Sequence, residues 1–91
     1  MRGLDYTNPQ HCFTSKNEVY TVTQDSVLIG TCYAYILETN WQEVYGGINL
    51  SINNLELGKI SNGSIYLYIS KNDVIKINEI KNGKIIILNY L

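Results

Sequence analysis

The clearest pattern in this chain is the alternation of apolar and polar side chains over its last third. From Leu55 to Leu91, apolar residues recur at every second position through four segments, which are separated by Asn-Gly, Lys-Asn-Asp and Asn-Gly. Alternation with a period of two is typical of half-buried β-strands, and Asn-Gly between such segments is typical of a two-residue hairpin turn. The pattern therefore predicts a four-strand meander over residues 55–91.

The turns also predict which residues face each other. Turns at Asn62-Gly63 and Asn82-Gly83 would each pair the isoleucine two positions before the asparagine with the isoleucine two positions after the glycine. A three-residue loop at Lys71-Asn72-Asp73 keeps the apolar residues of the two hairpins on one face, whereas a two-residue loop would reverse one strand. The predicted core face consists of Ile60, Ile65, Leu67, Ile69, Ile75, Ile77, Ile86, Leu88 and Tyr90.

The opposite face of the predicted meander suits neither a core nor a solvent surface, because it mixes aromatic, aliphatic and polar side chains. It carries Tyr66, Tyr68, Lys76, Asn78, Ile80, Ile85, Ile87, Asn89 and Leu91. We expect such a face to be covered, either by another layer of this chain or by another molecule. The same register places Lys59 and Lys76 across the strand pair from the two tyrosines.

The first half of the chain predicts further strands. Residues 1–17 show no periodicity and predict an irregular N-terminal arm. Residues 18–23, 26–38 and 48–52 alternate and predict three strands. Gly30, inside the second of these segments, indicates a bend or a bulge that would let one strand serve two sheets or close a small barrel.

The segment around Trp41 changes pattern. Thr39 with Gln42 fits a helix capping box, and Gly46-Gly47 would end a helical turn that starts there. A continued strand followed by a glycine-rich turn is the alternative. Residues 1–91 as a whole predict one all-β domain, a small barrel or sandwich of about six to seven antiparallel strands that ends in the four-strand meander.

Composition agrees with this fold class and reduces the number of possible functions. A chain of 91 residues suits one domain with a modest core, and its eight tyrosines and many isoleucines favour strands. No apolar stretch follows Met1, so we expect no signal peptide, no membrane span and a cytoplasmic location. A net charge of −1 argues against bulk binding to a phosphate backbone.

Residue types that carry chemistry are few. The chain has one histidine, His11, and two cysteines, Cys12 and Cys32. Adjacent residues of an extended segment point in opposite directions, so His11 and Cys12 make a poor nucleophile and base pair, while His11 with Cys32 stays open. No tight pair of metal ligands occurs, and a disulfide is not expected in a reducing compartment. We therefore expect a non-enzymatic protein without a cofactor or metal.

Three functions fit these expectations. The first is a small inhibitor that blocks a host protein by direct contact; the abundance of Ile, Asn, Lys and Tyr suggests an AT-rich genome and favours a phage or mobile element acting on a host defence protein. The second is a β-barrel that binds single-stranded nucleic acid or a nucleotide signal through stacked tyrosines and a lysine. The third is a self-assembling accessory protein, a homodimer through the face of the C-terminal strand. The candidate binding residues are Tyr66, Tyr68, Lys76, Asn78, Ile85, Ile87, Lys59, Tyr33, Tyr35 and Trp41.

Overall fold

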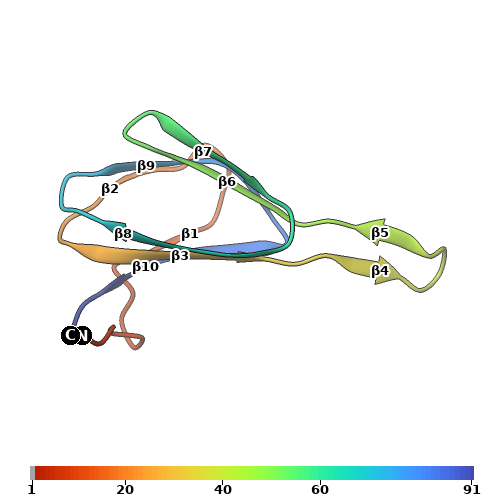
Figure 1. Ribbon diagram of the computed structural model, residues 1–91, viewed down its shortest axis with the longest axis horizontal. Coiled ribbons are helices and arrows are strands. Elements are labelled where there is room, and N and C mark those ends of the chain that lie inside the picture. Colours follow the sequence, from red (N-terminus) through yellow and green to blue (C-terminus); the bar gives the residue numbers. More distant parts are fainter. Residues whose placement is uncertain (1) are drawn as a thin grey trace.

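Two four-stranded antiparallel sheets pack face to face and form a β-sandwich (Figure 1). The computed structural model describes residues 2–91, and that part of the chain contains ten strands and no helix. The strands are β1 (His11–Phe13), β2 (Val19–Thr21), β3 (Ser26–Cys32), β4 (Tyr35–Leu37), β5 (Gln42–Val44), β6 (Gly47–Ile52), β7 (Leu55–Ile60), β8 (Gly63–Ile69), β9 (Val74–Lys81) and β10 (Gly83–Asn89). The expected all-β sandwich is confirmed, with more strands than predicted.

Consecutive strands near the C-terminus alternate between the two sheets instead of pairing with each other. The first sheet has the order β1-β10-β3-β8, and the second has the order β2-β9-β6-β7. The four strands predicted for residues 55–91 all form, in the predicted order and joined by short turns. The residue pairs predicted between them are wrong, because each of these turns carries the chain from one sheet to the other.

Backbone angles show that the two Asn-Gly turns are not type I′ hairpin turns. A two-residue type I′ turn needs a positive φ at both central positions. Only Gly63 of the first turn and only Asn82 of the second have one. Asn53 and Asn54, in contrast, have φ values of 52° and 69°, and they form the tight turn between the paired strands β6 and β7.

The observed pairing moves two predicted surface residues into the core. Ile85 and Ile87 point between the sheets and are 0 % exposed, because β10 is an inner strand between β1 and β3. Their predicted place on a binding surface is therefore wrong. Ile75 and Ile77 are buried between the sheets, as the predicted core face requires, whereas Leu88 is buried on the outer side of its sheet.

The core lies between the two sheets and draws on nearly all of their strands. It consists of Phe13, Val22, Leu28, Cys32, Ile48, Leu50, Ile69, Ile75, Ile77, Ile85 and Ile87. At roughly 1.5–3 kcal/mol for each fully buried large side chain, this cluster is the main source of folding free energy. Phe13 belongs to β1, so the prediction of an irregular arm is wrong for residues 11–13.

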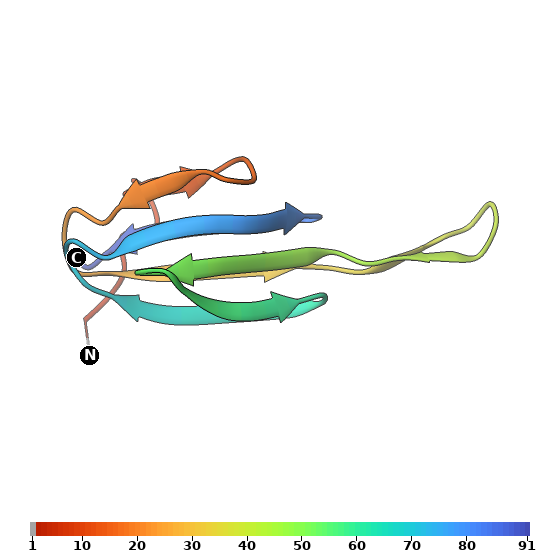
Figure 2. The same ribbon diagram turned by 90° about the horizontal axis from the view of Figure 1, so that it is seen from above.

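The two sheets converge at one end of the sandwich, where residues 33–46 leave it as a protruding hairpin formed by β4 and β5 (Figures 1 and 2). β4 continues the line of β3 from the first sheet, and β5 leads into β6 of the second. Glycines make room for this convergence. A Cβ atom on Gly83 would lie 2.5 Å from the carbonyl oxygen of Thr31, and one on Gly46 would lie 2.7 Å from that of Tyr33. Gly46 lies where the chain enters β6, and Tyr33 lies just after β3, so main chain meets main chain there between the two sheets. Gly83 and Thr31 are neighbours within the first sheet.

Gly30 has a different role from the bend or bulge that the sequence indicates. The pairs on both sides of β3 run without a register shift, so Gly30 marks no bulge. The residue is buried, and a Cβ atom there would lie 2.9 Å from Cδ1 of Ile48 on the other sheet. The missing side chain gives Ile48 its space, so this glycine serves the packing of sheet against sheet.

We predict that substitutions at Gly30 and Ile48 are coupled. Gly30→Ala alone should lower the free energy of unfolding by about 1–3 kcal/mol, because the added methyl group meets the end of Ile48. Ile48→Val alone should cost about 0.5–1.5 kcal/mol. Since valine lacks the Cδ1 atom, the double variant should lose less than the sum. Urea denaturation of the four proteins measures this coupling, and strictly additive losses would contradict the contact.

Candidate functional site

The outer face of the second sheet is an ordinary polar surface. Lys59 Nζ lies 3.3 Å from a carboxylate oxygen of Glu79, and Asn78 Nδ2 donates a hydrogen bond of 2.8 Å to Ser51 Oγ. Lys76, which pairs with Ser51, is exposed on the same face. Three candidate binding residues, Lys59, Lys76 and Asn78, thus lie among solvated polar groups.

The outer face of the first sheet is apolar and rich in tyrosine. Tyr66 and Tyr68 are neighbours on β8, with ring centroids 5.9 Å apart and exposed fractions of 52 % and 78 %. They pair with Ile29 and Val27 on β3. The lysines predicted beside them are on the other sheet, so the combination of stacked rings and cations expected for a nucleic-acid site is not formed.

The N-terminal arm, residues 2–10, forms one wall of a groove on this tyrosine-rich face. Leu4 forms a β-bridge with Tyr90, and the guanidinium carbon of Arg2 lies 4.5 Å from the centroid of the Tyr90 ring. Partial desolvation raises the pKa of Tyr66, and nearby tyrosines of the sheet and the arm add to the rise. The groove has a volume of about 530 Å³ and is lined by Arg2, Leu4, Asp25, Tyr66, Tyr68, Ile69, Ser70 and Tyr90.

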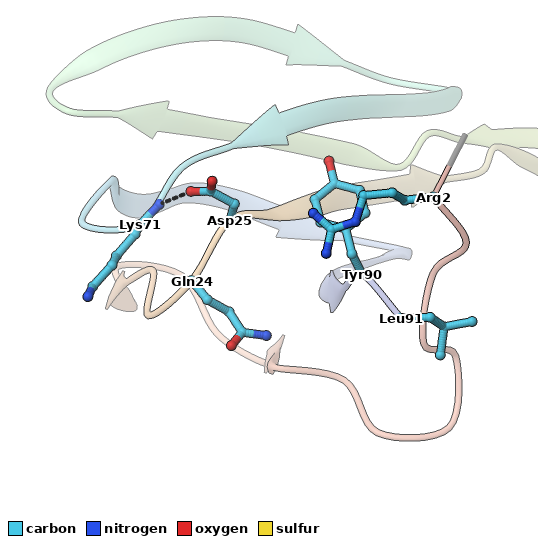
Figure 3. Close-up of a pocket in the computed structure, with 6 residues that line it drawn as sticks. All are labelled: Arg2, Gln24, Asp25, Lys71, Tyr90 and Leu91. Atoms are coloured by element: carbon cyan, nitrogen blue, oxygen red, sulfur yellow. Dashed lines mark hydrogen bonds between the residues drawn. The ribbon is translucent and has the colours of Figure 1, made fainter.

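A second hollow of about 470 Å³ adjoins this groove and shares Arg2, Asp25 and Tyr90 with it (Figure 3). Asp25 Oδ1 accepts a hydrogen bond of 2.9 Å from the main-chain N–H of Lys71, so the carboxylate holds the loop that follows β8. Arg2 lies over Tyr90 on the opposite side of the hollow. Charges of both signs line this space, and it therefore selects neither anions nor cations strongly.

The protruding hairpin exposes large apolar side chains on both of its faces. The exposed fractions are 57 % for Tyr33, 42 % for Tyr35, 54 % for Ile36, 79 % for Trp41 and 53 % for Tyr45. Tyr33 and Tyr35 have ring centroids 6.1 Å apart on one face, whereas Ile36 lies on the other. No residue of the buried hydrophobic core comes from residues 33–45, so the hairpin contributes surface alone.

The base of the hairpin is held by the two Asn-Gly turns. The N–H of Tyr33 donates to the main-chain carbonyl of Asn82 at 3.1 Å, and the N–H of Ala34 donates to Asn62 Oδ1 at 3.3 Å. Both turns therefore support the point where the hairpin leaves the sandwich. The sequence pattern alone does not reveal this role, because it joins residues far apart in the chain.

The tip of the hairpin replaces the helical turn expected near Trp41. Thr39 and Gln42 form no capping box; instead, Asn40 Oδ1 accepts a hydrogen bond of 3.0 Å from the N–H of Gln42. Trp41 has a positive φ of 55°, which closes the turn between β4 and β5. The observed strands agree with the alternative interpretation, but the glycine-rich turn that it expected at Gly46-Gly47 does not form, because the turn lies at residues 38–41 and Gly47 begins β6. The indole ring therefore lies at the end of the hairpin.

His11 and the two cysteines do not form one site. The His11 ring stacks on Tyr20 with a centroid distance of 4.0 Å, and its Nε2 atom lies 2.5 Å from Glu18 Oε2. Cys12 is exposed on the outer face of the first sheet, whereas Cys32 points into the core and donates to a main-chain carbonyl at 3.3 Å. The cysteines are both free, on opposite faces of one sheet.

The candidate residues thus separate into three surfaces and the core. Ile36 and Tyr45, on the protruding hairpin, are exposed residues that were not among the candidates. The sequence does indicate these two residues, because residues 33–45 carry apolar side chains on both faces of the two strands. That pattern is typical of strands buried on both faces, and only the structure shows that nothing among residues 2–91 buries them.

Two features are absent from the described part of the chain. Among residues 2–91, no three histidine, cysteine, aspartate or glutamate side chains lie close enough together to hold a metal ion. The same residues include no helix with the length and apolarity needed to cross a lipid bilayer. Comparison with protein-family models, with curated proteins and with solved structures found no match for this chain.

We predict that Glu18 makes stability depend on pH. A hydrogen bond of 2.9 Å from the N–H of Thr14, together with His11, holds the pKa of Glu18 below its usual range. A lowered carboxylate pKa stabilises the fold above the ordinary glutamate pKa, and this contribution is lost as pH falls through the lowered value. Urea midpoints measured from about pH 7 to about pH 3 should therefore fall more for the wild type than for Glu18→Gln. Equal pH dependence of the two proteins would argue against this role.

Proposed function

We propose that this protein is a non-enzymatic binding protein that recognises a partner protein through the protruding hairpin, residues 33–46. The observation that carries the proposal is the exposure of five large apolar side chains on an element that adds nothing to the core. Contiguous exposed apolar surface is typical of interaction sites. Tryptophan and tyrosine are also the residue types that most often carry the binding energy of an interface.

The hairpin is ordered before it meets a partner. Its base is tied to Asn62 and Asn82, its tip is closed by Asn40, and three residue pairs join its strands. A recognition element held in this way loses little conformational entropy on binding. It extends along the longest axis of the molecule, which measures 46 Å, so it can enter a groove that a flat surface could not fill (Figure 2).

The charge of the hairpin indicates the chemistry of the partner. Residues 33–46 contain two acidic residues, Glu38 and Glu43, and no lysine or arginine. Electrostatic complementarity then favours a partner groove with an apolar floor and a basic rim. A nucleic acid is a poor partner for this element, since its phosphates would be repelled by the two carboxylates.

Binding of this kind would act by occupying the groove of the partner. The composition of the chain suggests a phage or mobile element, and in that setting the partner is a host protein, such as a defence protein, that the hairpin blocks. The inhibitory role rests on composition and on the scarcity of catalytic residue types. The choice of the hairpin as the contact rests on its exposed side chains.

We predict that Trp41 both reports binding and contributes strongly to it. It is the only tryptophan and is 79 % exposed, so its fluorescence should resemble that of tryptophan in water and shift to shorter wavelength when a partner buries it. Trp41→Ala should weaken binding by at least about 2 kcal/mol, roughly thirtyfold. Affinity capture from a lysate of the producing host, followed by titration of the captured protein, measures both effects.

Leu55→Ala is the matched control, because Leu55 is a large apolar residue, 68 % exposed, on the sandwich rather than on the hairpin. The control should capture the same protein as the wild type, whereas Trp41→Ala should lose it while keeping its circular dichroism spectrum. Equal capture by both variants would exclude the hairpin tip as the contact.

A further inference from the structure

Three of the four strands at the free edges of the two sheets are protected against pairing with another molecule. Free edges expose main-chain N–H and C=O groups, and natural proteins protect them by shortness, charge or bulges. β1 and β2 have three residues each. β7 carries Glu56 and Lys59, and its pairing with β6 shifts register next to Gly58, whose φ is 98°.

The fourth edge strand, β8, lacks each of these protections. It has seven residues, and it pairs with β3 over its whole length without a register shift. Its sequence, GSIYLYI, contains no charged residue and no proline. A long, regular and uncharged edge of this kind is a template to which a further strand can be added.

The core is also open beside β8. A cleft of about 330 Å³ lies between β7 and β8, lined by Ile48, Leu50, Leu57, Gly58, Lys59, Ile60, Ile65 and Leu67. Ile65 and Leu67 pack against the core, yet they are only partly buried. Because burying apolar surface is favourable, a strand added to β8 would gain from covering these two side chains as well as from main-chain hydrogen bonds.

We propose that β8 pairs with the β8 strand of a second copy of this chain, antiparallel and across a two-fold axis at Tyr66. In that register Ile65 faces the partner's Leu67 on the inner side, and Ser64 faces the partner's Tyr68 on the outer side. Antiparallel pairing of identical strands keeps the alternation of the two faces, so apolar side chains meet apolar side chains. The first sheets of both copies become one continuous sheet, with four strands from each.

The lack of charge on β8 suits pairing with a second copy of itself. A strand without charged residues brings no like charges opposite each other when it pairs with itself. Specificity for another protein would require complementary charges or shapes along the edge. β8 has no charged residue that could supply such charges. The two protruding hairpins would point in opposite directions, because β3 of one copy runs antiparallel to β3 of the other. The dimer does not depend on the function proposed above.

Sedimentation equilibrium of the full chain tests the dimer. The wild type should sediment as a dimer, and Tyr66→Lys with Tyr68→Lys should weaken it by about tenfold to a hundredfold, since like charges then face each other across the pair. Tyr66→Glu with Tyr68→Glu should do the same. An equimolar mixture of the two double variants should form a dimer again. Val19→Lys, on the exposed edge strand β2, is the control and should stay dimeric.

Hydrogen exchange of the wild type gives a second test that needs no substitution. Amides of β8 should exchange more slowly at high than at low protein concentration, while those of β2 should not change. A wild type that stays monomeric at millimolar concentration would overturn the proposal. So would a dimer that survives both double variants, an assembly larger than a dimer, or protection that grows on β2 instead of β8.

Discussion

The close approach of main chain to main chain at one end of the sandwich determines the shape of the molecule. Two stacked sheets normally lie about 10 Å apart, a distance that their side chains maintain. Around Cys32, Gly46 removes such a side chain, and the carbonyl oxygen of Tyr33 occupies the space that a Cβ atom would need. The chain next to β3 and β6, which belong to different sheets, can therefore come together and leave the sandwich as the paired strands β4 and β5.

This convergence also gives a reason for the path of the C-terminal half. Both Asn-Gly turns lie at the converging end, where Asn62 and Asn82 accept hydrogen bonds from the first residues of the hairpin. Each turn spans the short gap between the sheets instead of folding a strand back on its neighbour in one sheet. The result is an up-and-down path in which sequence neighbours face each other across the core.

Period-two alternation predicts the all-β class and most strand positions, because it records which side chains face a core. It does not record which strand is the neighbour, and for that reason it places Ile85 and Ile87 on a surface although both are buried. The exposure of Tyr66 and Tyr68 is predictable, since they alternate with the buried or half-buried Ile65, Leu67 and Ile69. The turn at Asn53 and Asn54, which joins β6 to β7, is harder to predict, because Asn-Gly is a stronger hairpin signal than Asn-Asn.

The protruding hairpin has a consequence for how such a chain can change over time. Residues 33–45 supply no member of the buried hydrophobic core, so substitutions there leave the folding free energy of the sandwich largely intact. Selection on what the hairpin touches and selection on whether the domain folds act on separate sets of residues. A lineage carrying this architecture is free to alter its contacts quickly, with the sandwich conserved as a scaffold underneath.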